Sequence, residues 1–459
     1  SRSRVDPRPS FPTAGTLGAT SVICKGSLAS SECWRDSAAM PVPFNRRTRR
    51  DADVRALDAA TFFNEDVPPM LVERGPMAAA GIEALDAPPL AVEVDGAAWS
   101  LVADGGTVAV HPGVADGALV VSFDAPTFSD WAQLQASLNG LGVAQVLQYR
   151  DGTARDVSIW DSLWLTIQDG WPIVDPDLTF VDREGRPLDL ARSFTRDDDP
   201  AEIAHFLREA GYLHLRGWLD PADMATISDD IDRAQGEYTE GDGRSWWAEL
   251  ADGSHRVVRL QDFLPYSPTT AAILDGPVWD QLRVTLAGDD VELMKGKAIE
   301  ALIKPVGVVR GASDVTFHRD CHLGRHPYTC SGATVGISVT GSSEANGRLR
   351  VCAGSHRVVM PVEIAKHDPY LPVVAVTTEP GDLTVHLSCT LHEARPPVSE
   401  ARKVMYAGFS QVPRPDEGDP RASAGGQALS ELRENAPKIL LGASAPTAKD
   451  AWDDAPPDA

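Results

Sequence analysis

The feature that most constrains the fold is a series of short β-rich runs, separated by Gly and Pro, in the second half of the chain. The runs are Ala301–Ile303, Thr334–Val339, Arg348–Cys352, Val373–Thr377, Asp382–His386 and Val404–Phe409. Many short strands at this spacing are typical of an antiparallel sandwich or barrel. The sequence therefore predicts a mainly β domain of the jelly-roll kind over residues 178–415.

A helix–strand–turn–helix pattern opens this domain. The segment "AEIAHFLREAGYLHLRGWLDPADMATISDDIDRA" begins after a charged break at Arg196 to Pro200. Asp220 suits the N-cap of the second helix, because its carboxylate can accept a hydrogen bond from a free amide of the first turn. Pro221 suits the first helical position, where the N–H that proline lacks would have no helical partner.

Residues 53–172 show the pattern of a separate, smaller α+β domain. Helical spacing over residues 54–83 is broken at Pro68-Pro69, and the apolar period then changes to two. Alternation and turn signals predict strands at Leu90–Val94, Trp99–Val102, Thr107–Val110 and Leu119–Phe123, followed by a helix over Phe128–Leu141.

The stretches "WSLVADGGTVAVHPGVADGALVVSFD" and "FSDWAQL" in this region resemble the sterol-carrier-protein type of lipid-binding domain. The resemblance covers about 100 residues and implies an apolar tunnel for an acyl or sterol-like ligand. The alternative is a degenerate module that serves only packing or dimerisation.

Charge and cysteine usage exclude some classes of partner and compartment. The net charge of −24 disfavours binding to nucleic acid or anionic membranes. No apolar stretch approaches the roughly 20 residues that cross a bilayer. The six cysteines are scattered without a C-x-x-C pair, which predicts reduced thiols and a cytoplasmic protein. Cys24 and Cys33 remain a candidate pair for an oxidising compartment.

Both ends of the chain are expected to lie outside the folded domains. Residues 1–50 are rich in Ser, Pro and Arg without apolar periodicity, and we hypothesise that Met40 is the biological start. Residues 416–459 form an acidic tail with one amphipathic helix over Ala428–Leu441, and the last fifteen residues have the composition of a disordered segment.

The segment Phe317-His318-Arg319-Asp320 contains the first candidate metal ligands. In an extended segment, residues i and i+2 project to one side, so His318 and Asp320 can both face a jelly-roll interior. A second imidazole would complete the two-His, one-carboxylate triad, which leaves three iron positions open for an oxoacid and O₂.

The distal imidazole is predicted at His392, downstream of the Pro380-Gly381-Asp382 turn. Arg402 follows ten residues later, at the head of the next strand. If these two strands were antiparallel neighbours, the guanidinium would lie beside the iron, where its planar fork can bind the far carboxylate of 2-oxoglutarate.

These pieces together resemble the phytanoyl-CoA dioxygenase family of iron and 2-oxoglutarate oxygenases. The matching motifs are "GYLHLRGWLDP", "HRD", "NGRLRVCAGSHR", "PGDLTVHLSCTLHEA" and Arg402, in the expected order over residues 200–412. The resemblance implies a double-stranded β-helix with His318, Asp320 and His392 on Fe(II) and Arg402 on 2-oxoglutarate, with O₂ as oxidant. Glu393-Ala394 stands where the family often has a small hydroxyl residue, which removes one accessory contact to 2-oxoglutarate.

Several alternatives remain open from the sequence. His386 shares strand parity with His392 and is a second candidate for the distal ligand. The spacing of His318, His322 and His326 would suggest a zinc face on a helix, which Gly324 and Pro327 disfavour. The remaining candidates are Lys304 for a contact to co-substrate or an exposed position, Ser355 and His356 for a polar pair in a turn, His322 or His326 for the substrate pocket, and Trp246 and Trp247 for a substrate lid or core packing.

The sequence thus predicts an Fe(II)- and 2-oxoglutarate-dependent dioxygenase that oxidises an unactivated C–H bond of a small lipid-like or secondary-metabolite substrate. Asp320 favours hydroxylation, desaturation or ring formation, because related halogenases lack this carboxylate. The rival readings are a non-catalytic lipid carrier, which would need no iron, and a cupin-type isomerase or hydrolase, which would not need Arg402.

Overall fold

The computed structural model describes Arg49 and residues 54–287, 293–295, 299–311, 315–321, 324, 332–411, 427–428 and 431–432. Every described residue belongs to one compact unit within residues 39–459. The predictions for the N-terminal extension, Met40, His322, His326 and most of the tail helix fall outside the described residues.

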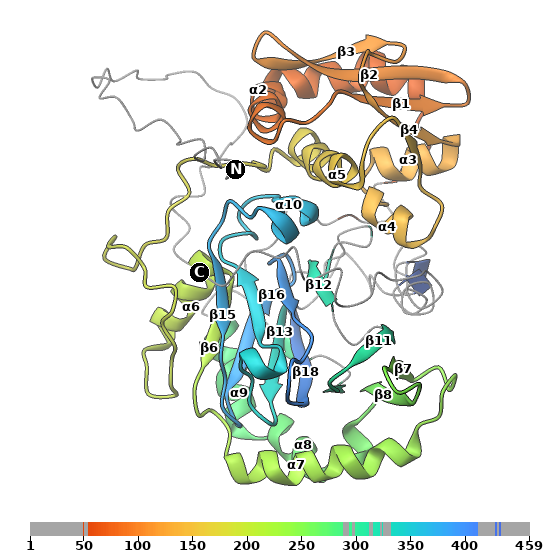
Figure 1. Ribbon diagram of the computed structural model, residues 1–459. Helices are drawn as coiled ribbons and strands as arrows, with labels where there is room; N and C mark the ends of the chain where they lie inside the picture. The colour runs from red at the N-terminus through yellow and green to blue at the C-terminus, as the bar shows by residue number, and fades with distance from the viewer. Residues whose placement is uncertain are drawn as a thin grey trace, which may run out of the picture. The chain divides into compact units, whose positions relative to one another are not determined.

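The N-terminal domain is a five-stranded sheet with helices packed on it (Figure 1). Its strand order is β3-β2-β1-β4-β5, in which β1 is antiparallel to β2 and parallel to β4. The elements are α1 (Ala59–Thr61), a π-helical turn (Phe62–Asp66), α2 (Val67–Leu85), β1 (Leu90–Val94), β2 (Ala97–Asp104), β3 (Thr107–Pro112), β4 (Leu119–Phe123), α3 (Ala125–Ala132), α4 (Leu138–Val143), β5 (Gln148–Arg150) and α5 (Ala154–Asp169).

Pro68-Pro69 lies in the first turn of α2, directly after the π-helical turn, so the expected interruption appears as a change of helix type. One expectation for this domain needs correction. The single helix expected over Phe128–Leu141 is two short helices, because the chain turns at Leu134, which has a φ of 59°. The four expected strands are all present.

Stacked aromatic rings form the core of the domain. The ring centroids of Trp131 and Trp164 lie 4.4 Å apart, and those of Phe63 and Trp99 lie 5.4 Å apart, both in stacked orientation. Phe123 stacks on the other side of Trp131 at 5.2 Å. Such rings contribute area burial and a further 0.5–1.5 kcal/mol or so for each pair. The sterol-carrier resemblance of the domain stays a prediction.

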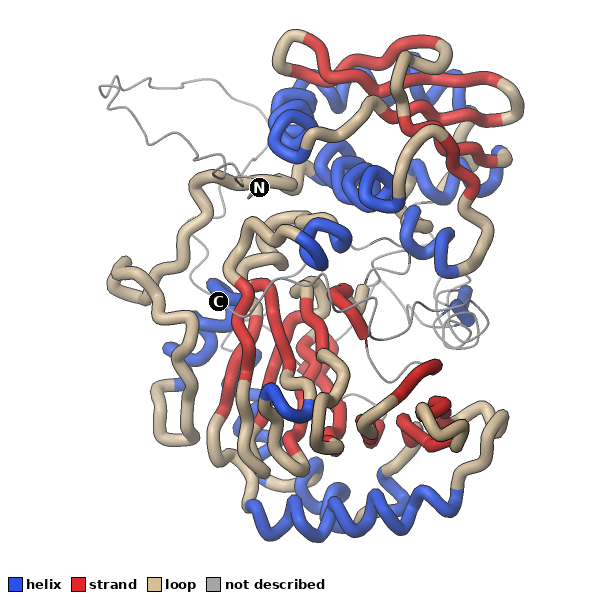
Figure 2. Tube along the Cα trace, viewed as in Figure 1, coloured by secondary structure: helices blue, strands red, loops and turns tan. Residues whose placement is uncertain are grey.

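The second domain is a β-sandwich with covering helices, as the jelly-roll prediction required (Figures 1 and 2). The larger sheet has the order β11-β7-β8-β10-β18-β13-β16-β6, with β9 paired to β18. The smaller sheet has the order β12-β17-β14-β15.

The sandwich is built from the following strands and helices in chain order. They are α6 (Pro200–Ala210), β6 (Tyr212–Leu215), α7 (Pro221–Ala234), β7 (Ser245–Leu250), β8 (His255–Leu260), α8 (Pro268–Leu274), α9 (Pro277–Ala287), β9 (Leu293–Lys295), β10 (Glu300–Lys304), β11 (Val308–Gly311), β12 (Val315–His318), β13 (Ala333–Ser338), β14 (Leu349–Cys352), α10 (Val362–His367), β15 (Val373–Val376), β16 (Leu383–Leu387), β17 (His392–Ala394) and β18 (Arg402–Gln411).

The opening helices begin as the sequence predicts. Asp220 caps α7 by accepting a hydrogen bond from the Ala222 amide at 2.9 Å, and Pro221 takes the first helical position. Gly211 ends α6 with a φ of 83°, a left-handed conformation in which a Cβ atom would be strained.

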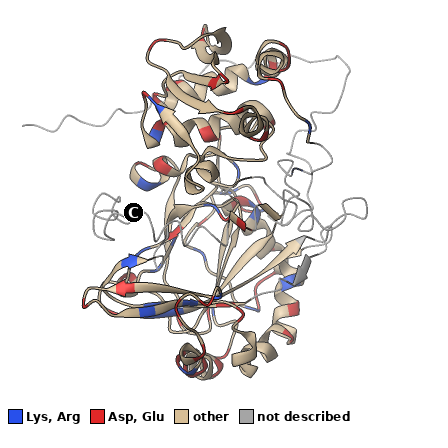
Figure 3. Cartoon of the chain, turned by 90° about the vertical axis from the view of Figure 1, so that its right-hand side faces the viewer, with Lys and Arg blue, Asp and Glu red and all other residues tan. Residues whose placement is uncertain are grey.

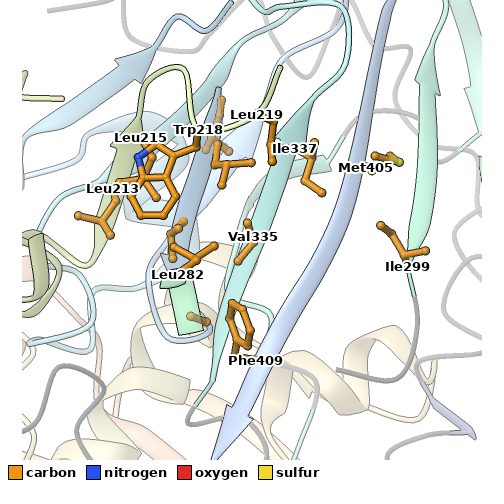
Figure 4. Close-up of a cluster of buried hydrophobic side chains, with 14 of the residues drawn as sticks. Leu213, Leu215, Trp218, Leu219, Leu282, Ile299, Val335, Ile337, Met405 and Phe409 are labelled. Atoms are coloured by element: carbon orange, nitrogen blue, oxygen red, sulfur yellow. The ribbon is translucent and has the colours of Figure 1, made fainter. Parts of the chain in front are cut away.

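The two faces of the larger sheet differ in character. One face carries apolar side chains from alternate positions, such as Val335, Ile337 and Met405, which pack with Leu282 of α9 and Trp218 (Figure 4). The other face carries the intervening residues, and these include Lys304, Thr334, Arg402 and Tyr406. The apolar face forms the core of the domain, so the polar face is the one that can hold a reactive site.

Figure 3 shows charged residues of both signs distributed over the described elements. Among the described helices, none combines the length and the apolar character that a membrane crossing needs.

Candidate metal centre

His318 and Asp320 come from the end of β12 and the turn that follows it. The side chain of Phe317, which precedes His318 in β12, is 1% exposed, whereas the side chains of His318 and Asp320 are about one-third exposed. Alternation along the strand therefore directs Phe317 into the core and its neighbour His318 to the opposite side.

His392 begins β17, which pairs antiparallel with β12. His318 and His392 are directly opposite each other in this pairing, and their ring centroids lie 4.2 Å apart. Cross-strand neighbours share one face of a sheet, so both imidazoles project to the same side. Two residues far apart in sequence are thereby brought together by one strand pair.

Asp320 completes a cluster with these two histidines. Its Oδ1 lies 3.6 Å from His318 Nε2 and 3.6 Å from His392 Nε2. One ligand atom from each of the three residues lies within 4.8 Å of the others. The structure thus brings together the three residues that the sequence singled out as metal ligands.

Backbone carbonyls fix the orientation of both imidazoles. His318 Nδ1 donates to Thr316 O at 2.9 Å, and His392 Nδ1 donates to Thr390 O at 3.0 Å. A carbonyl can only accept, so each Nδ1 carries the proton and each Nε2 keeps its lone pair for the cluster. Outer contacts of this kind are usual for metal-bound histidines.

Asp320 is held by its other carboxylate oxygen. Thr334 Oγ1 donates to Asp320 Oδ2 at 2.9 Å, and His386 Nε2 lies 3.4 Å from the same oxygen. Oδ1 is therefore the oxygen that faces the two histidines. Thr334 was not predicted from the sequence, because its spacing from Asp320 depends on β13 belonging to the opposite sheet.

Electrostatics keep the cluster in the ionisation state that a cation requires. Burial alone would raise the pKa of Asp320, but the charges of His392, His386 and His318 together with the His386 contact outweigh it and hold the pKa well below its usual range. Burial, reinforced by His386 and His318, holds the pKa of His392 well below that of a free imidazole. One carboxylate and neutral imidazoles are the ligand forms that bind divalent metals.

The donor set fits ferrous iron. Two imidazole nitrogens and one carboxylate oxygen on one side of an ion are the donors of the two-His, one-carboxylate iron site. Iron would be held by His318, Asp320 and His392, with the remaining positions open to co-substrate and oxygen.

Arg402 reaches the same side from the larger sheet. It is buried and pairs across β10 and β18 with Lys304, so the two cations share the polar face. The expectation that the strands of His392 and Arg402 are neighbours is wrong: β17 lies in the smaller sheet and β18 in the larger one. The chain crosses between the sheets in the intervening loop, so Arg402 is on a strand of the opposing sheet.

Lys304 is buried at 2% exposure, which contradicts the alternative of an exposed lysine. Its Nζ donates to the carbonyls of Ala394 and Arg395, both at 2.8 Å. These carbonyls belong to and follow β17, so the lysine ties the larger sheet to the strand that carries His392. A contact to co-substrate stays a prediction.

His386, the second candidate for the distal ligand, is fully buried beside the cluster. Its ring centroid lies 3.9 Å from that of His392, and its Nε2 lies 3.4 Å from Asp320 Oδ2. The parity argument fails because β16 ends at Leu387 and His392 starts a new strand in the other sheet. His386 thus supports the carboxylate from behind, while His392 faces it from within the cluster.

The remaining candidates have clear positions. Ser355 Oγ donates to Cys352 O at 2.7 Å and accepts from the Leu391 amide at 2.8 Å, so this hydroxyl is satisfied in a turn as predicted. His356 instead reaches outside the turn: its Nε2 donates to Arg208 O of α6 at 2.8 Å, and its Nδ1 has no hydrogen-bond partner among the described residues. Glu393 turns away from His392 and forms a buried ion pair with Arg350.

The two tryptophans separate. Trp247 packs against the core of the sandwich, which fits the packing alternative. Trp246 lies under the guanidinium of Arg259, at 4.2 Å from the guanidinium carbon to the ring centroid. Arg259 also forms an ion pair with Glu300. The charges of Arg402, Asp320 and Arg259 act on the hydroxyl of Tyr406. Sequence reasoning missed Arg259, Glu300 and Tyr406, since single polar residues in strands give no spacing signal.

The comparison with protein families agrees with this geometry. Residues 207–405 match the family described as phytanoyl-CoA dioxygenase (PhyH). The match covers the sandwich from α6 to β18 and includes the three clustered residues and Arg402. Together with the His–Asp–His cluster it assigns iron, 2-oxoglutarate and O₂ as the cofactors, and an oxygenase as the enzyme class.

Solved structures with partial likeness include AviO1 from Streptomyces viridochromogenes Tue57, which is 22% identical with a TM-score of 0.39 over 47% of this chain and 98% of that chain. The epimerase SnoN, in complex with Fe3+, alpha ketoglutarate and nogalamycin RO, is 22% identical with a TM-score of 0.37 over 46% and 84%. EctD from S. alaskensis in its apoform is 19% identical with a TM-score of 0.38 over 49% and 82%. No curated protein sequence matches the chain. These likenesses are remote, and the site rests on the family match and the geometry.

Proposed function

We propose that this protein is an Fe(II)- and 2-oxoglutarate-dependent dioxygenase that hydroxylates an unactivated C–H bond of a small molecule. The observation that carries the proposal is the convergence of His318, Asp320 and His392, with their ligand atoms within 4.8 Å of one another. Iron with 2-oxoglutarate supplies the oxidising power for such a reaction, and the protein supplies position and exclusion of water.

The chain's own residues divide the work between the two sheets. The smaller sheet and its turn contribute the metal ligands, with each imidazole oriented by a carbonyl two residues before it. The larger sheet contributes Arg402, which we assign to the distal carboxylate of 2-oxoglutarate because a guanidinium fork matches that group. Lys304, its cross-strand neighbour, adds positive charge beside the same anion.

Asp320 supports hydroxylation as the outcome. Its Oδ1 faces the imidazoles and its Oδ2 is anchored by Thr334, so the carboxylate occupies the position that a halide would need. With three protein ligands in place, the open positions serve co-substrate and oxygen.

The polar face of the larger sheet bears on the substrate class. This face also carries Tyr406, on which the charges of Arg402, Asp320 and Arg259 act, and Glu300 and Trp246 contact Arg259. Aromatic and charged groups of this kind favour a functionalised metabolite over a plain acyl chain. A lipid-like substrate would instead depend on the sterol-carrier resemblance of the N-terminal domain.

The test measures metal and co-substrate binding before turnover. Purified protein is loaded anaerobically with Fe(II) and titrated with 2-oxoglutarate, and the visible charge-transfer absorption of the chelate is followed. We expect the band in the native protein, its loss in Asp320→Ala, and a co-substrate affinity at least 100-fold weaker in Arg402→Ala. Lys403→Ala is the matched control, because Lys403 is the next residue along β18 and instead pairs with Asp232 at 2.6 Å.

Turnover is then measured as succinate release with a panel of small molecules. A rise above the basal rate identifies substrates, and the mass of the product shows whether one oxygen atom has been added. Absence of Fe(II)-dependent 2-oxoglutarate binding in the native protein would refute the proposal. Turnover that survives Arg402→Ala would favour a cupin-type isomerase or hydrolase instead.

A further inference from the structure

A pair of thiols lies directly beside the metal centre. Cys321 Sγ and Cys389 Sγ are 3.5 Å apart, and the two side chains are 2% and 7% exposed. Cys321 is the residue after Asp320, and Cys389 precedes His392 by three residues. The two cysteines form a small cluster of their own, apart from the large apolar cores of the chain.

We propose that Cys321 and Cys389 form a reversible disulfide when the protein meets hydrogen peroxide, and that this bond disables the metal site. The bond itself depends only on the geometry of the two thiols, whereas its effect on metal binding rests on the proposed function. A dithiol next to a centre that handles oxygen is a modification site of a kind distinct from the reaction at iron.

The distance makes the bond accessible. A disulfide has an S–S length of about 2.05 Å, so the sulfurs must approach by roughly 1.5 Å. Arg319 already joins the two segments, because its Nε donates to Cys389 O at 3.0 Å and it lies two residues before Cys321. The chain segments therefore need little reorganisation before the sulfurs meet.

The chemistry balances with peroxide as the oxidant. One thiol attacks the O–O bond, gives a sulfenic acid and releases water; the second thiol then attacks that sulfur and expels a second water. Two thiols and one hydrogen peroxide become one disulfide and two water molecules. Both sulfurs are oxidised, and both peroxide oxygens are reduced.

The consequence for the metal site follows from the backbone. Drawing Cys321 toward Cys389 pulls on the residue before it, Asp320, whose Oδ1 must stay near both imidazoles. Displacement of a ligand by a fraction of an ångström to one ångström weakens metal binding, and changes of this type in the support of ligands typically cost 10- to 100-fold in affinity.

A third buried thiol provides the internal control. Cys352 belongs to the apolar core that includes α10, and burial, followed by the charge of Glu393, raises the pKa of its thiol to about 12. A thiol that stays protonated reacts slowly with peroxide. Cys352 is therefore expected to remain reduced under conditions that oxidise the pair.

The experiment oxidises metal-free, full-length protein with hydrogen peroxide, removes the peroxide with catalase, and maps the cysteines by peptide mass spectrometry. We expect a cross-linked peptide pair joining Cys321 to Cys389, lighter by two hydrogens than the reduced peptides, and its disappearance after dithiothreitol. Fe(II) affinity is then compared anaerobically. It should fall at least tenfold in the oxidised native protein and recover on reduction.

Cys389→Ala and Cys352→Ala separate this mechanism from general oxidative damage. After the same treatment Cys389→Ala should keep its Fe(II) affinity, and Cys352→Ala should lose it as the native protein does. A folded native protein whose Cys321 is unmodified or overoxidised without the cross-link would overturn the proposal, as would a cross-linked protein with unchanged affinity. If the reduced protein bound no Fe(II) at all, the proposed function would fail, but the cross-linked peptide would still show whether the two thiols form a disulfide.

Discussion

Gly211 is a position where a single added methyl group should destabilise the sandwich. Its φ is 83°, and a Cβ atom there would lie 2.4 Å from His356 Nδ1 and 2.6 Å from Thr390 Oγ1. For a residue with a Cβ, the left-handed conformation costs about 1–2 kcal/mol. Overpacking against two buried groups adds about 1–3 kcal/mol. We therefore expect Gly211→Ala to lower the free energy of unfolding by about 2–5 kcal/mol.

Gly217→Ala separates the two contributions. Gly217 also has a positive φ, 61°, but no atom lies within 4 Å of the position of its Cβ. This control should lose only the backbone term of about 1 kcal/mol. Urea denaturation of both variants measures the difference, which we expect to be about 2 kcal/mol.

The same substitution should also weaken the metal site. Thr390 Oγ1 donates to Gly211 O at 2.9 Å, and Thr390 O orients the ring of His392. Movement of Thr390 therefore reaches a ligand, and Gly211→Ala should bind Fe(II) more weakly than Gly217→Ala. Equal unfolding free energies for the two variants would refute the argument that the clash, rather than φ alone, sets the cost.

Three further outcomes are expected. Burial and the charge of Arg357 lower the pKa of His356 to about 4, although the hydrogen bond to the Arg208 carbonyl opposes the shift. Because this folded-state pKa lies below the unfolded value near 6.5, stability that is present at neutral pH is lost as the pH falls from 6.5 toward 4. That loss amounts to about 2 kcal/mol at pH 5. Urea denaturation at pH 7 and pH 5 measures it, and the unfolding free energy of His356→Gln should fall less between the two pH values. Glu393→Gln should cost about 3–5 kcal/mol by leaving Arg350 buried without its partner, whereas Arg350→Met combined with Glu393→Leu should cost far less; a double variant as unstable as the single one would contradict this. Lys304→Met removes two hydrogen bonds to carbonyls beside β17 and should lower both the unfolding free energy, by about 2–3 kcal/mol, and the affinity for 2-oxoglutarate, by at least tenfold; unchanged calorimetric affinity would limit Lys304 to a structural role.

Local signals predicted much of the fold. The strands at Leu90–Val94 and Leu119–Phe123 and the cap at Asp220 all appear where periodicity and capping chemistry place them. The hairpin of β7 and β8 and the helices α8 and α9 were not predicted. Apolar side chains of β8 and α9 belong to the core of the sandwich, and such long-range packing leaves no clear period in a short segment.

The site shows the same division. The pairing of His318 with His392 could be anticipated because the chemistry of iron demands two imidazoles and a carboxylate at one place. The sheet to which each strand belongs could not, since a crossing between sheets and a hairpin need similar loop lengths. This is why Arg402 was expected on a neighbouring strand although it lies on the opposing sheet. For the same reason, the contacts of Thr334 and His386 with Asp320 were not predicted from the sequence.

The far side of the smaller sheet gives the N-terminal domain a physical role. Phe317 and Leu391, the residues immediately before His318 and His392, belong to one apolar core with residues of that domain and of α10. The Glu363 amide at the start of α10 donates to Ser158 Oγ of α5 at 3.2 Å, which joins the helix to the same domain. Because side chains alternate across a strand, packing on Phe317 and Leu391 fixes the direction in which both imidazoles project. Residues 53–172 therefore contact the back of the sheet whose front carries the two histidines, whatever ligand this domain binds.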